Sequence, residues 1–526
     1  MKKIIIALSS LVLGSALFAS SYRIKSAEYK ITGSRANFTG KTREYSLKTK
    51  VPVDYKRIFN NEDELVEYIN DLKQQIENTR NFEKVSVDFS VSEPNENDES
   101  LVLLQISTYD SMHFIAAPYP KYSSGDSLNL TVKMKDTNFL GSMETMTGEA
   151  KFAFELDEND KPTDTLVGLG FDFETPFQLA SLDATWENSF DFSYTFGDST
   201  PEWNIDTGLN LTKKFNKFSV ETTFNQIFAK NLDYKEEDLN GKVVHYGDDT
   251  YFGEKIGLSI PITIQEINNW GKIYYTPFFE GTYYWDFDGI SSENTDLSSP
   301  VISFGQTLST ERVNWIENFR NGLSLSITNS FGYNFQTYSF IPSVTGEILA
   351  YKAFKHFAIN TDIYGFAVMN GTKSFGERLR GIRDDQYFSE DTGEHVHEKA
   401  CTSAAALVVN IDVPIKICRI YWEDVPLIKK IKFAKYFNLE AQISPFVDFA
   451  IFHNEASDTT FHPKDGFLCG GLEGIIYPLK IKGIQVRASF GVDLSRKMPK
   501  IKSFFHQDWR DNVKSYEISI GLGLHY

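Results

Sequence analysis

The chain ends in YEISIGLGLHY (residues 516–526), and the alternation of side-chain types in this stretch decides how the rest of the sequence is interpreted. Successive side chains of an extended strand point to opposite faces, so every second residue shares a face. One face here would carry only apolar or aromatic side chains, at Tyr516, Ile518, Ile520, Leu522, Leu524 and Tyr526. The stretch is therefore predicted to be a β-strand with one face against a nonpolar environment.

The same alternation extends backwards through residues 111–526. It is clear in WNIDTGLNL (203–211), GKIYYTPFFEGTYYWDF (271–287) and QVRASFGVDL (485–494), and sixteen to eighteen such segments can be marked. A soluble all-β fold would alternate in the same way. Three further features favour a membrane barrel: aromatic residues crowd the segment ends, short turns alternate with long polar loops, and the second face is rich in Ser, Thr, Asn and Gly.

The way the chain could cross a membrane follows from its apolar runs. After residue 20 no run approaches the roughly 20 apolar residues that a spanning helix needs, so any crossing must use strands. In hydrocarbon every backbone N–H and C=O must be paired, so the last strand must close onto the first. We expect a mainly β fold, a 16-stranded transmembrane β-barrel over residues 111–526. Its last strand would face lipid up to Leu524, with Tyr526 at the membrane boundary.

Composition and charge narrow the class of protein further. The 526 residues are 41% hydrophobic and 14% aromatic, enough for a large core or a large apolar surface. The net charge of −18 argues against a nucleic-acid partner, because no basic face stands out that would displace counterions from phosphates. Cys401, Cys418 and Cys469 are too few for a disulfide framework, although a bridge between the first two stays open.

The first twenty residues read MKKIIIALSSLVLGSALFAS, with two lysines, a short apolar run and then small residues. This pattern predicts a signal peptide over residues 1–20, and an anchor helix is the alternative. The expected location is the outer membrane, with the N-terminal domain in the periplasm.

Residues 21–110 differ from the barrel region and predict a small α+β domain. YRIKSAEYKIT (22–32) is strand-like, and the helical spacing of Leu65, Tyr68, Ile69, Leu72 and Ile76 predicts a helix beginning near Asn61. FEKVSVDFSVS (82–92) and SLVLLQIST (100–108) then predict a hairpin. The order resembles a polypeptide-transport-associated (POTRA) domain, which implies a site for extended client segments. A plain α+β spacer is the alternative.

The longest loop-like stretch contains ERLRGIRDD (377–385). Within it, Leu379, Arg380, Gly381 and Ile382 resemble the V-R-G-F/Y loop motif of the BamA/TamA superfamily of outer-membrane insertases and secretion pores. PFVDFAIF (445–452) resembles its F-x-D-x-G strand motif through Phe446 and Asp448, with Ala450 at the Gly position. DTNFLG (136–141) resembles the D-x-N-x-x-G element near the start of the barrel, and residues 471–494 resemble the hairpin before the last strand. The elements occur in the family's order over nearly the whole mature chain.

The lumen loop motif predicts an ion pair. A guanidinium cannot be deprotonated and offers five donors, so a carboxylate on the wall could hold it bidentately and fix the loop. We expect Arg380 to pair with Asp448, and Gly381 to allow the loop tip to turn. The Ala at position 450 puts the closeness of packing there in doubt. A solvated arginine in an extracellular loop is the alternative.

The resemblance implies a protein that inserts or translocates proteins at the outer membrane. Expected partners are outer-membrane lipid, unfolded outer-membrane or secreted protein clients, and accessory envelope lipoproteins. The single front domain departs from the general insertases, which carry several. The alternative is a passive porin-like channel or a surface adhesin with the same architecture. No nucleophile, carboxylate pair or phosphate loop stands out, so neither an enzyme nor a cofactor is expected.

Two other stretches contain side chains that could bind a metal or a lipid headgroup. EHVHEKAC (394–401) holds possible metal ligands, but solvated polar residues of an acidic loop explain it better, and no metal site is expected. PLIKKIKFAKYF (426–437) could be a basic turn near lipid headgroups or a plain solvated turn.

Overall fold

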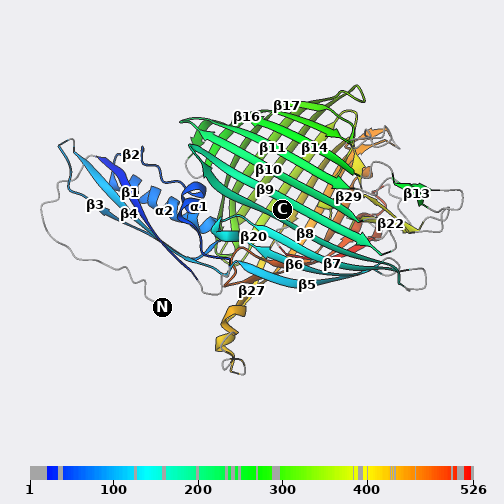
Figure 1. The fold of residues 1–526 in the computed structure, drawn as a ribbon. Helices are drawn as coiled ribbons and strands as arrows, with labels where there is room; N and C mark the ends of the chain where they lie inside the picture. The colour runs from blue at the N-terminus through cyan, green and yellow to red at the C-terminus, as the bar shows by residue number, and fades with distance from the viewer. Residues whose placement is uncertain are drawn as a thin grey trace.

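The computed structural model describes most of the chain as one front domain and one barrel (Figure 1). The described residues are 21–33, 39–96, 98–123, 127–156, 162–196, 201–230, 235–237, 243–246, 250–267, 271–286, 297–382, 384–388, 395–399, 401–426, 428, 431, 434–455, 458–498, 502–505 and 515–522. The predicted signal peptide (1–20) lies outside them.

The front domain is a four-stranded sheet covered by two helices. Its elements are β1 (Ser21–Gly33), α1 (Glu44–Lys50), β2 (Ile58–Phe59), α2 (Glu62–Asn78), β3 (Phe82–Val91) and β4 (Glu99–Asp110). The sheet order is β2-β1-β4-β3, with β1 parallel and β3 antiparallel to β4. The strand, helix and hairpin predicted for residues 22–108 are all present.

The helix α2 forms where its apolar spacing predicts. The side chain of Asn61 accepts a hydrogen bond from the backbone N–H of Glu64 at 2.8 Å, which caps the first turn. The buried face carries Leu65, Ile69, Leu72 and Ile76, which join the core of the domain. This core holds the helix against the sheet, so the domain has a hydrophobic centre of its own.

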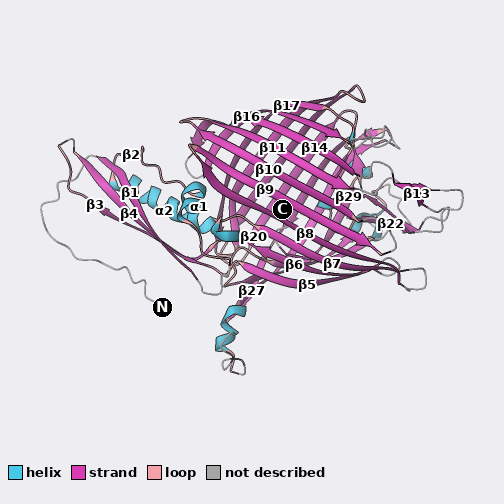
Figure 2. Ribbon diagram, in the orientation of Figure 1, coloured by secondary structure: helices cyan, strands magenta, loops and turns pink. Residues whose placement is uncertain are grey.

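The second unit is a closed antiparallel barrel (Figure 2). Its strands are β5 (Phe114–Ser123), β6 (Ser127–Asp136), β7 (Met146–Leu156), β8 (Pro162–Leu179), β9 (Leu182–Thr195), β10 (Glu202–Lys214), β11 (Ser219–Lys230), β14 (Thr250–Ser259), β15 (Ile262–Ile267), β16 (Gly271–Trp285), β17 (Val301–Ile316), β18 (Phe319–Asn334), β19 (Ser339–Ala353), β20 (Ala358–Val368), β25 (Ala405–Asp412), β26 (Ile415–Ile420), β27 (Leu439–Asn454), β28 (Thr459–Thr460), β29 (Phe467–Pro478), β30 (Val486–Asp493) and β31 (Tyr516–Leu522). The last strand, β31, neighbours the first, β5, as pairing in hydrocarbon would require.

The number of strands around the wall corrects one expectation. Of the twenty-one segments in the closed order, β15 continues β14, β26 continues β25, and β28 is a two-residue addition to β27, which leaves eighteen wall strands in the described part of the chain. This is two more than the predicted sixteen. Turns as short as residues 180–181 and 317–318 join adjacent strands, so few loop residues mark the boundary between one strand and the next in the sequence.

The two faces of the wall differ as the alternation predicts. On β31 the side chains of Tyr516, Ile518 and Ile520 point outward and are 53%, 68% and 50% exposed. On β27 the inward positions run from Glu440 through Asp448 and are buried. The outer surface is therefore largely apolar and the inner one largely polar.

Shorter elements lie at the ends of the barrel. They are β12 (Lys235–Glu237), β13 (Val243–Tyr246), β21 (Lys373–Ser374), β22 (Asp384–Phe388), β23 (His395–Lys399), β24 (Thr402–Ser403), α3 (Leu494–Lys497) and the 3-10 turns η1 (Phe139–Gly141), η3 (Gly376–Arg378), η4 (Trp422–Asp424), η5 (Ala434–Phe437) and η6 (Pro463–Asp465). The β13 and β22 hairpins lie at the end opposite the front domain (Figure 1). Among the described residues, no helix is long and apolar enough to cross a membrane.

The front domain is joined to the barrel through the DTNFLG stretch. Nδ1 of His113 lies 2.5 Å from Oδ1 of the buried Asp136, whose other oxygen accepts a hydrogen bond from Thr39 at 2.7 Å. The backbone N–H of Arg43 donates to the carbonyl of Gly141 at 2.9 Å. Gly141 has a φ of +72°, and a Cβ there would lie 2.2 Å from the Lys41 carbonyl oxygen. The motif thus provides a docking surface for the loop before α1.

Arg80, at the end of α2, makes a second attachment. Its Nε donates to the carbonyl of Lys482 at 2.6 Å, and its Nη1 donates to the carbonyl of Glu317 at 2.9 Å. The guanidinium also stacks over the Trp315 ring at 4.2 Å. Burial lowers the pKa of Arg80 to about 10, so it stays cationic at neutral pH. One side chain therefore ties the front domain to the β17–β18 turn and to the β29–β30 turn, which lie on separate parts of the wall.

Candidate functional site

The candidate site lies in the connection between β20 and β25, whose residues 375–382 fold back against the inner wall of the barrel. Its two ends are held together by the pairing of β21 with β24. Phe375, Leu379 and Ile382 are almost fully buried in a hydrophobic cluster against the inner wall. The wall side chains of this cluster are Phe366, Ala406, Val408, Ala450, Phe452, Phe467 and Cys469. These apolar contacts hold the loop within an otherwise polar interior.

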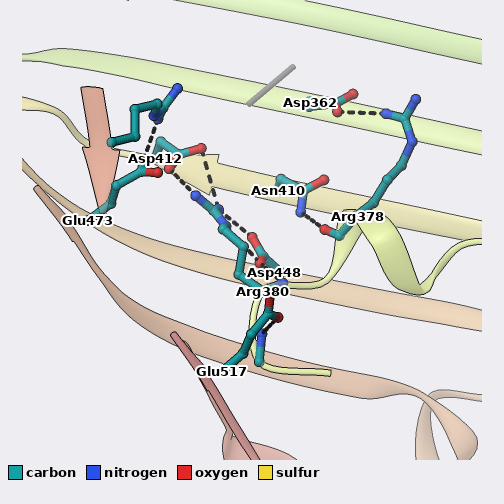
Figure 3. Close-up of polar contacts among 10 residues, drawn as sticks. Asp362, Arg378, Arg380, Asn410, Asp412, Asp448, Glu473 and Glu517 are labelled. Carbon is teal, nitrogen blue, oxygen red and sulfur yellow. Dashed lines mark hydrogen bonds and ion pairs between the residues drawn. The ribbon is translucent and has the colours of Figure 1, made fainter. Parts of the chain in front are cut away.

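Arg380 is almost fully buried, with 1% of its surface exposed. Its Nε and Nη2 donate to the two oxygens of Asp448 on β27, at 3.0 and 2.5 Å (Figure 3). Its Nη1 donates to Oδ1 of Asp412 on β25 at 2.6 Å. The guanidinium lies 3.7 Å from the centre of the Phe446 ring. The predicted partner, Asp448, is therefore joined by a second carboxylate and by an aromatic face.

The backbone of the loop tip is also fixed. The N–H of Arg380 donates to Asp448 at 2.9 Å, and the N–H of Gly381 donates to Glu517 on β31 at 3.0 Å. Gly381 has a φ of +120°, which favours glycine. A Cβ on Gly491 of β30 would lie 2.4 Å from the Arg380 carbonyl oxygen, so the tip rests directly on the backbone of the wall. The loop thus contacts the last two strands of the barrel.

A neighbouring arginine extends the network away from the tip. Nη1 of Arg378 donates to Glu347 at 2.7 Å and to Asp362 at 2.9 Å. The carbonyl of Arg378 accepts from Asn410 at 2.7 Å (Figure 3). The loop is therefore bound to the part of the inner wall from β19 through β31, which comprises seven of the eighteen wall strands in the described part of the chain.

The structure brings the predicted residues of the loop motif and of β27 together. Leu379, Arg380, Gly381 and Ile382 lie together at the loop tip, and Phe446 and Asp448 face them from β27. Ala450 is fully buried in the same cluster, so the expected glycine is not needed for close contact there. In the last strand, the side chain of Leu522 and all of Leu524 and Tyr526 lie outside the described residues.

Sequence reasoning missed Asp412, Glu517 and the partners of Arg378. A signal for the first two was present, because Asp412 ends the alternating AALVVNID strand and Glu517 is the lone charge on the inward face of the closing strand. What the sequence does not show is that both carboxylates lie at the height of Arg380, because that depends on the register of several strands.

The other two stretches, residues 394–401 and 426–437, lie only partly within the described part of the chain. The side chains of residues 395–400 lie outside the described part, and among the described residues no group of His, Cys, Asp or Glu could hold a metal ion. Lys429, Lys430 and Lys432 also lie outside it.

Comparison with known proteins gives only distant similarity. No protein-family model and no curated protein matches the chain. Among solved structures, CdiB from Acinetobacter baumannii aligns at 10% identity over 95% of this chain and 74% of its own, with a TM-score of 0.43. CdiB from Escherichia coli aligns at 9% identity over 95% and 75%, with a TM-score of 0.46. BamA from Haemophilus ducreyi lacking POTRA domains 1–3 aligns at 12% identity over 94% and 84%, with a TM-score of 0.35. Similarities of this size do not assign the chain to a family.

Proposed function

We propose that this protein is an outer-membrane barrel of the BamA/TamA superfamily, with its single POTRA-like domain in the periplasm, that inserts or translocates proteins at the outer membrane. The motif resemblance supports the family, and the closed barrel with its apolar exterior supports the membrane. Outer-membrane lipid would be its surroundings, and unfolded outer-membrane or secreted proteins its clients. Accessory envelope lipoproteins are a further proposed partner.

The single observation that carries the proposal is the buried ionic attachment of the loop tip. Arg380 is held by Asp448 and Asp412, and the next N–H donates to Glu517 on the strand that closes the barrel. A simple diffusion pore needs no such attachment beside its closing strands. An attachment of this kind would hold β30 and β31 in position while the edge of β31 separates from β5. That behaviour suits a protein that offers a strand edge to its clients.

The proposed function requires backbone hydrogen bonds between the barrel and a client segment, and it requires no catalysis. The N–H and C=O groups at the edges of β5 and β31 would pair with an extended client segment when the seam opens. The client's own folding would supply the driving force, so neither a nucleotide nor an enzyme active site is needed. The edge strand β3 of the front sheet could hold the same segment beforehand.

The proposal is tested by depleting the protein from its own cell and measuring other outer-membrane barrels by quantitative proteomics. Their levels should fall, and expression of the wild-type chain should restore them. The Arg380→Glu variant should fail to restore them, while Lys373→Ala, on an exposed cation of the same loop, should succeed. If barrel levels hold and only solute uptake or cell adhesion changes, the insertase proposal is wrong and the channel or adhesin alternative stands.

Exchanging the charges of Arg380 and Asp448 tests their ion pair in the same rescue experiment. Arg380→Asp combined with Asp448→Arg recreates one ion pair, but it leaves the new carboxylate near Asp412. We therefore expect the double exchange to restore function only in part, and the further change Asp412→Asn to improve it. The absence of any rescue would contradict a direct electrostatic role.

A further inference from the structure

A row of polar side chains crosses the outer wall of the barrel. Asn188 on β9, Thr207 on β10, Gln226 on β11 and Glu254 on β14 are aligned in register, each directly opposite the next. Directly opposed residues of neighbouring strands share a face of the sheet. These four residues are called the polar row below.

The neighbours of the polar row show that it faces outward. Trp186, Phe224 and Ile256 lie two residues from members of the row and are 48%, 48% and 51% exposed. Residues two apart on a strand share a face, so the row lies on the apolar exterior. Aromatic side chains border it on the other side, where Phe228 stacks on Phe252.

The hydrogen bonds of the row are incomplete. Thr207 donates to Oδ1 of Asn188 at 2.9 Å and accepts from Trp186 Nε1 at 3.0 Å. Both oxygens of Glu254 lie 2.8 Å from Nε1 of Trp285. The Asn188 amide nitrogen is buried without a partner. Among the described residues, none hydrogen-bonds the exposed amide of Gln226.

An amide facing acyl chains has no water to bind, so an unpaired one is unfavourable there. We propose that the polar row is the contact surface for a second copy of this chain, in a dimer whose twofold axis runs along the membrane normal. This inference rests on the membrane placement proposed above and goes beyond the transport function.

The chemistry of the row fits a second copy. Amides both donate and accept, so the exposed amide of Gln226 can pair with the same amide of a second copy, as a twofold contact requires. The Asn188 amide nitrogen is covered by its own chain and lies beneath this contact. Because the strands are tilted, two facing rows would cross near Thr207 and Gln226. Glu254 lies at one end of the row and already accepts from an indole, so its carboxylate would not face its own copy.

The position of the row agrees with the proposed transport function. Strands β9, β10, β11 and β14 are separated from the closing strands β31 and β5 by β6, β7 and β8. The loop of the candidate site is bound to the other part of the wall. A dimer formed here would leave the seam, the loop and the front domain free to act.

The first experiment places a photo-crosslinking amino acid at position 226 of the full-length chain in living cells. Illumination should give an adduct of about twice the mass of the chain that contains only this protein. The same amino acid at Phe304, which is 59% exposed on the outer face of β17, should give none. An adduct with a different protein at position 226 would overturn the second-copy proposal.

The second experiment measures dimerisation of the purified full chain in detergent by sedimentation. Asn188→Leu with Gln226→Leu should weaken it about tenfold or more. The matched control is Gln306→Leu, which removes an exposed outer-face amide whose oxygen accepts a hydrogen bond from the Tyr275 hydroxyl at 2.5 Å, and this variant should dimerise as wild type does. Equal dimerisation of the leucine pair, or a wild-type monomer at every concentration, would overturn the proposal.

Two checks keep the results interpretable. Each variant should keep the heat-dependent mobility of a folded barrel on gels, and if the double variant does not fold, Gln226→Leu alone replaces it. Failure of the membrane placement would look different, because the wild-type chain would then stay soluble without detergent.

Discussion

At the scale of single residues, the notable feature is an excess of buried carboxylates around Arg380. One guanidinium serves both Asp448 and Asp412, and all three side chains are almost fully buried. Breaking a buried ionic contact costs far more than breaking an exposed one, because the remaining charge is left without water or a partner. Arg380 therefore stabilises the two carboxylates as much as they stabilise the loop.

We expect Arg380→Ala to destabilise the barrel by about 3–5 kcal/mol, because two buried carboxylates would then face each other without a cation. The change would appear as a lower urea midpoint for loss of the folded band on gels. Lys373→Ala should shift it by about 0–1 kcal/mol, since Lys373 is exposed on the same loop. Similar losses for the two variants would show that the ionic cluster does not hold the loop.

At the scale of elements, the loop tip and the last two strands depend on one another. β30 has 8 residues, whereas β17 and β18 have 16 each. The shorter strand shares fewer backbone hydrogen bonds with its neighbours. The contacts of the loop tip with Gly491 on β30 and with Glu517 on β31 add what this short ladder lacks.

Gly491→Ala should displace the loop tip, because the new methyl group would lie 2.4 Å from the Arg380 carbonyl oxygen. Overpacking of this kind costs about 1–3 kcal/mol. Limited proteolysis of the folded barrel should then cut the loop faster. Gly521→Ala is the matched control on β31, where a Cβ meets nothing within 4 Å, and it should cut at the wild-type rate. Equal rates for the two variants would contradict the contact.

Much at this scale could be predicted from the sequence, for identifiable reasons. Alternation depends only on neighbouring residues, so it indicated the strands and the outward face of Tyr516, Ile518 and Ile520. The pairing of Arg380 with Asp448 came from motif resemblance. Asp412 and Glu517 were missed because their approach to Arg380 depends on the register of β25 and β31 relative to β27. The strand number was too low because very short turns leave little trace in the sequence.

At the scale of the whole molecule, the front domain is bound to the barrel at several separate points. Near the start of β5, Nε2 of His113 lies 3.1 Å from the carbonyl oxygen of Gly40, and Asp136 accepts a hydrogen bond from Thr39 at 2.7 Å. Arg80 joins the end of α2 to two distant turns. Asn78 adds a hydrogen bond to Asn314 at 2.9 Å. The sequence indicated two units but not this attachment, because it connects residues several hundred positions apart.

Arg80→Ala should release α2 from the barrel, since it removes the hydrogen bonds to Lys482, Glu317 and Asn318 and the contact with Trp315. Hydrogen bonds from a charged group contribute about 1.5–3 kcal/mol each, so docking should weaken by at least about 2 kcal/mol. Distances between spin labels on α2 and on β17 should broaden. Arg57→Ala, on an exposed cation within the front domain, should leave them narrow. Unchanged distances in Arg80→Ala would show that the other contacts suffice.

The reach of Arg80 also has a consequence for how the protein is made. The carbonyl that it needs at Lys482 belongs to one of the last segments to leave the ribosome, whereas Arg80 itself emerges early. The contacts of the front domain with Asp136, Asn314 and Glu317 use segments that are made earlier. The attachment to the β29–β30 turn is therefore the last of these contacts that the growing chain can complete.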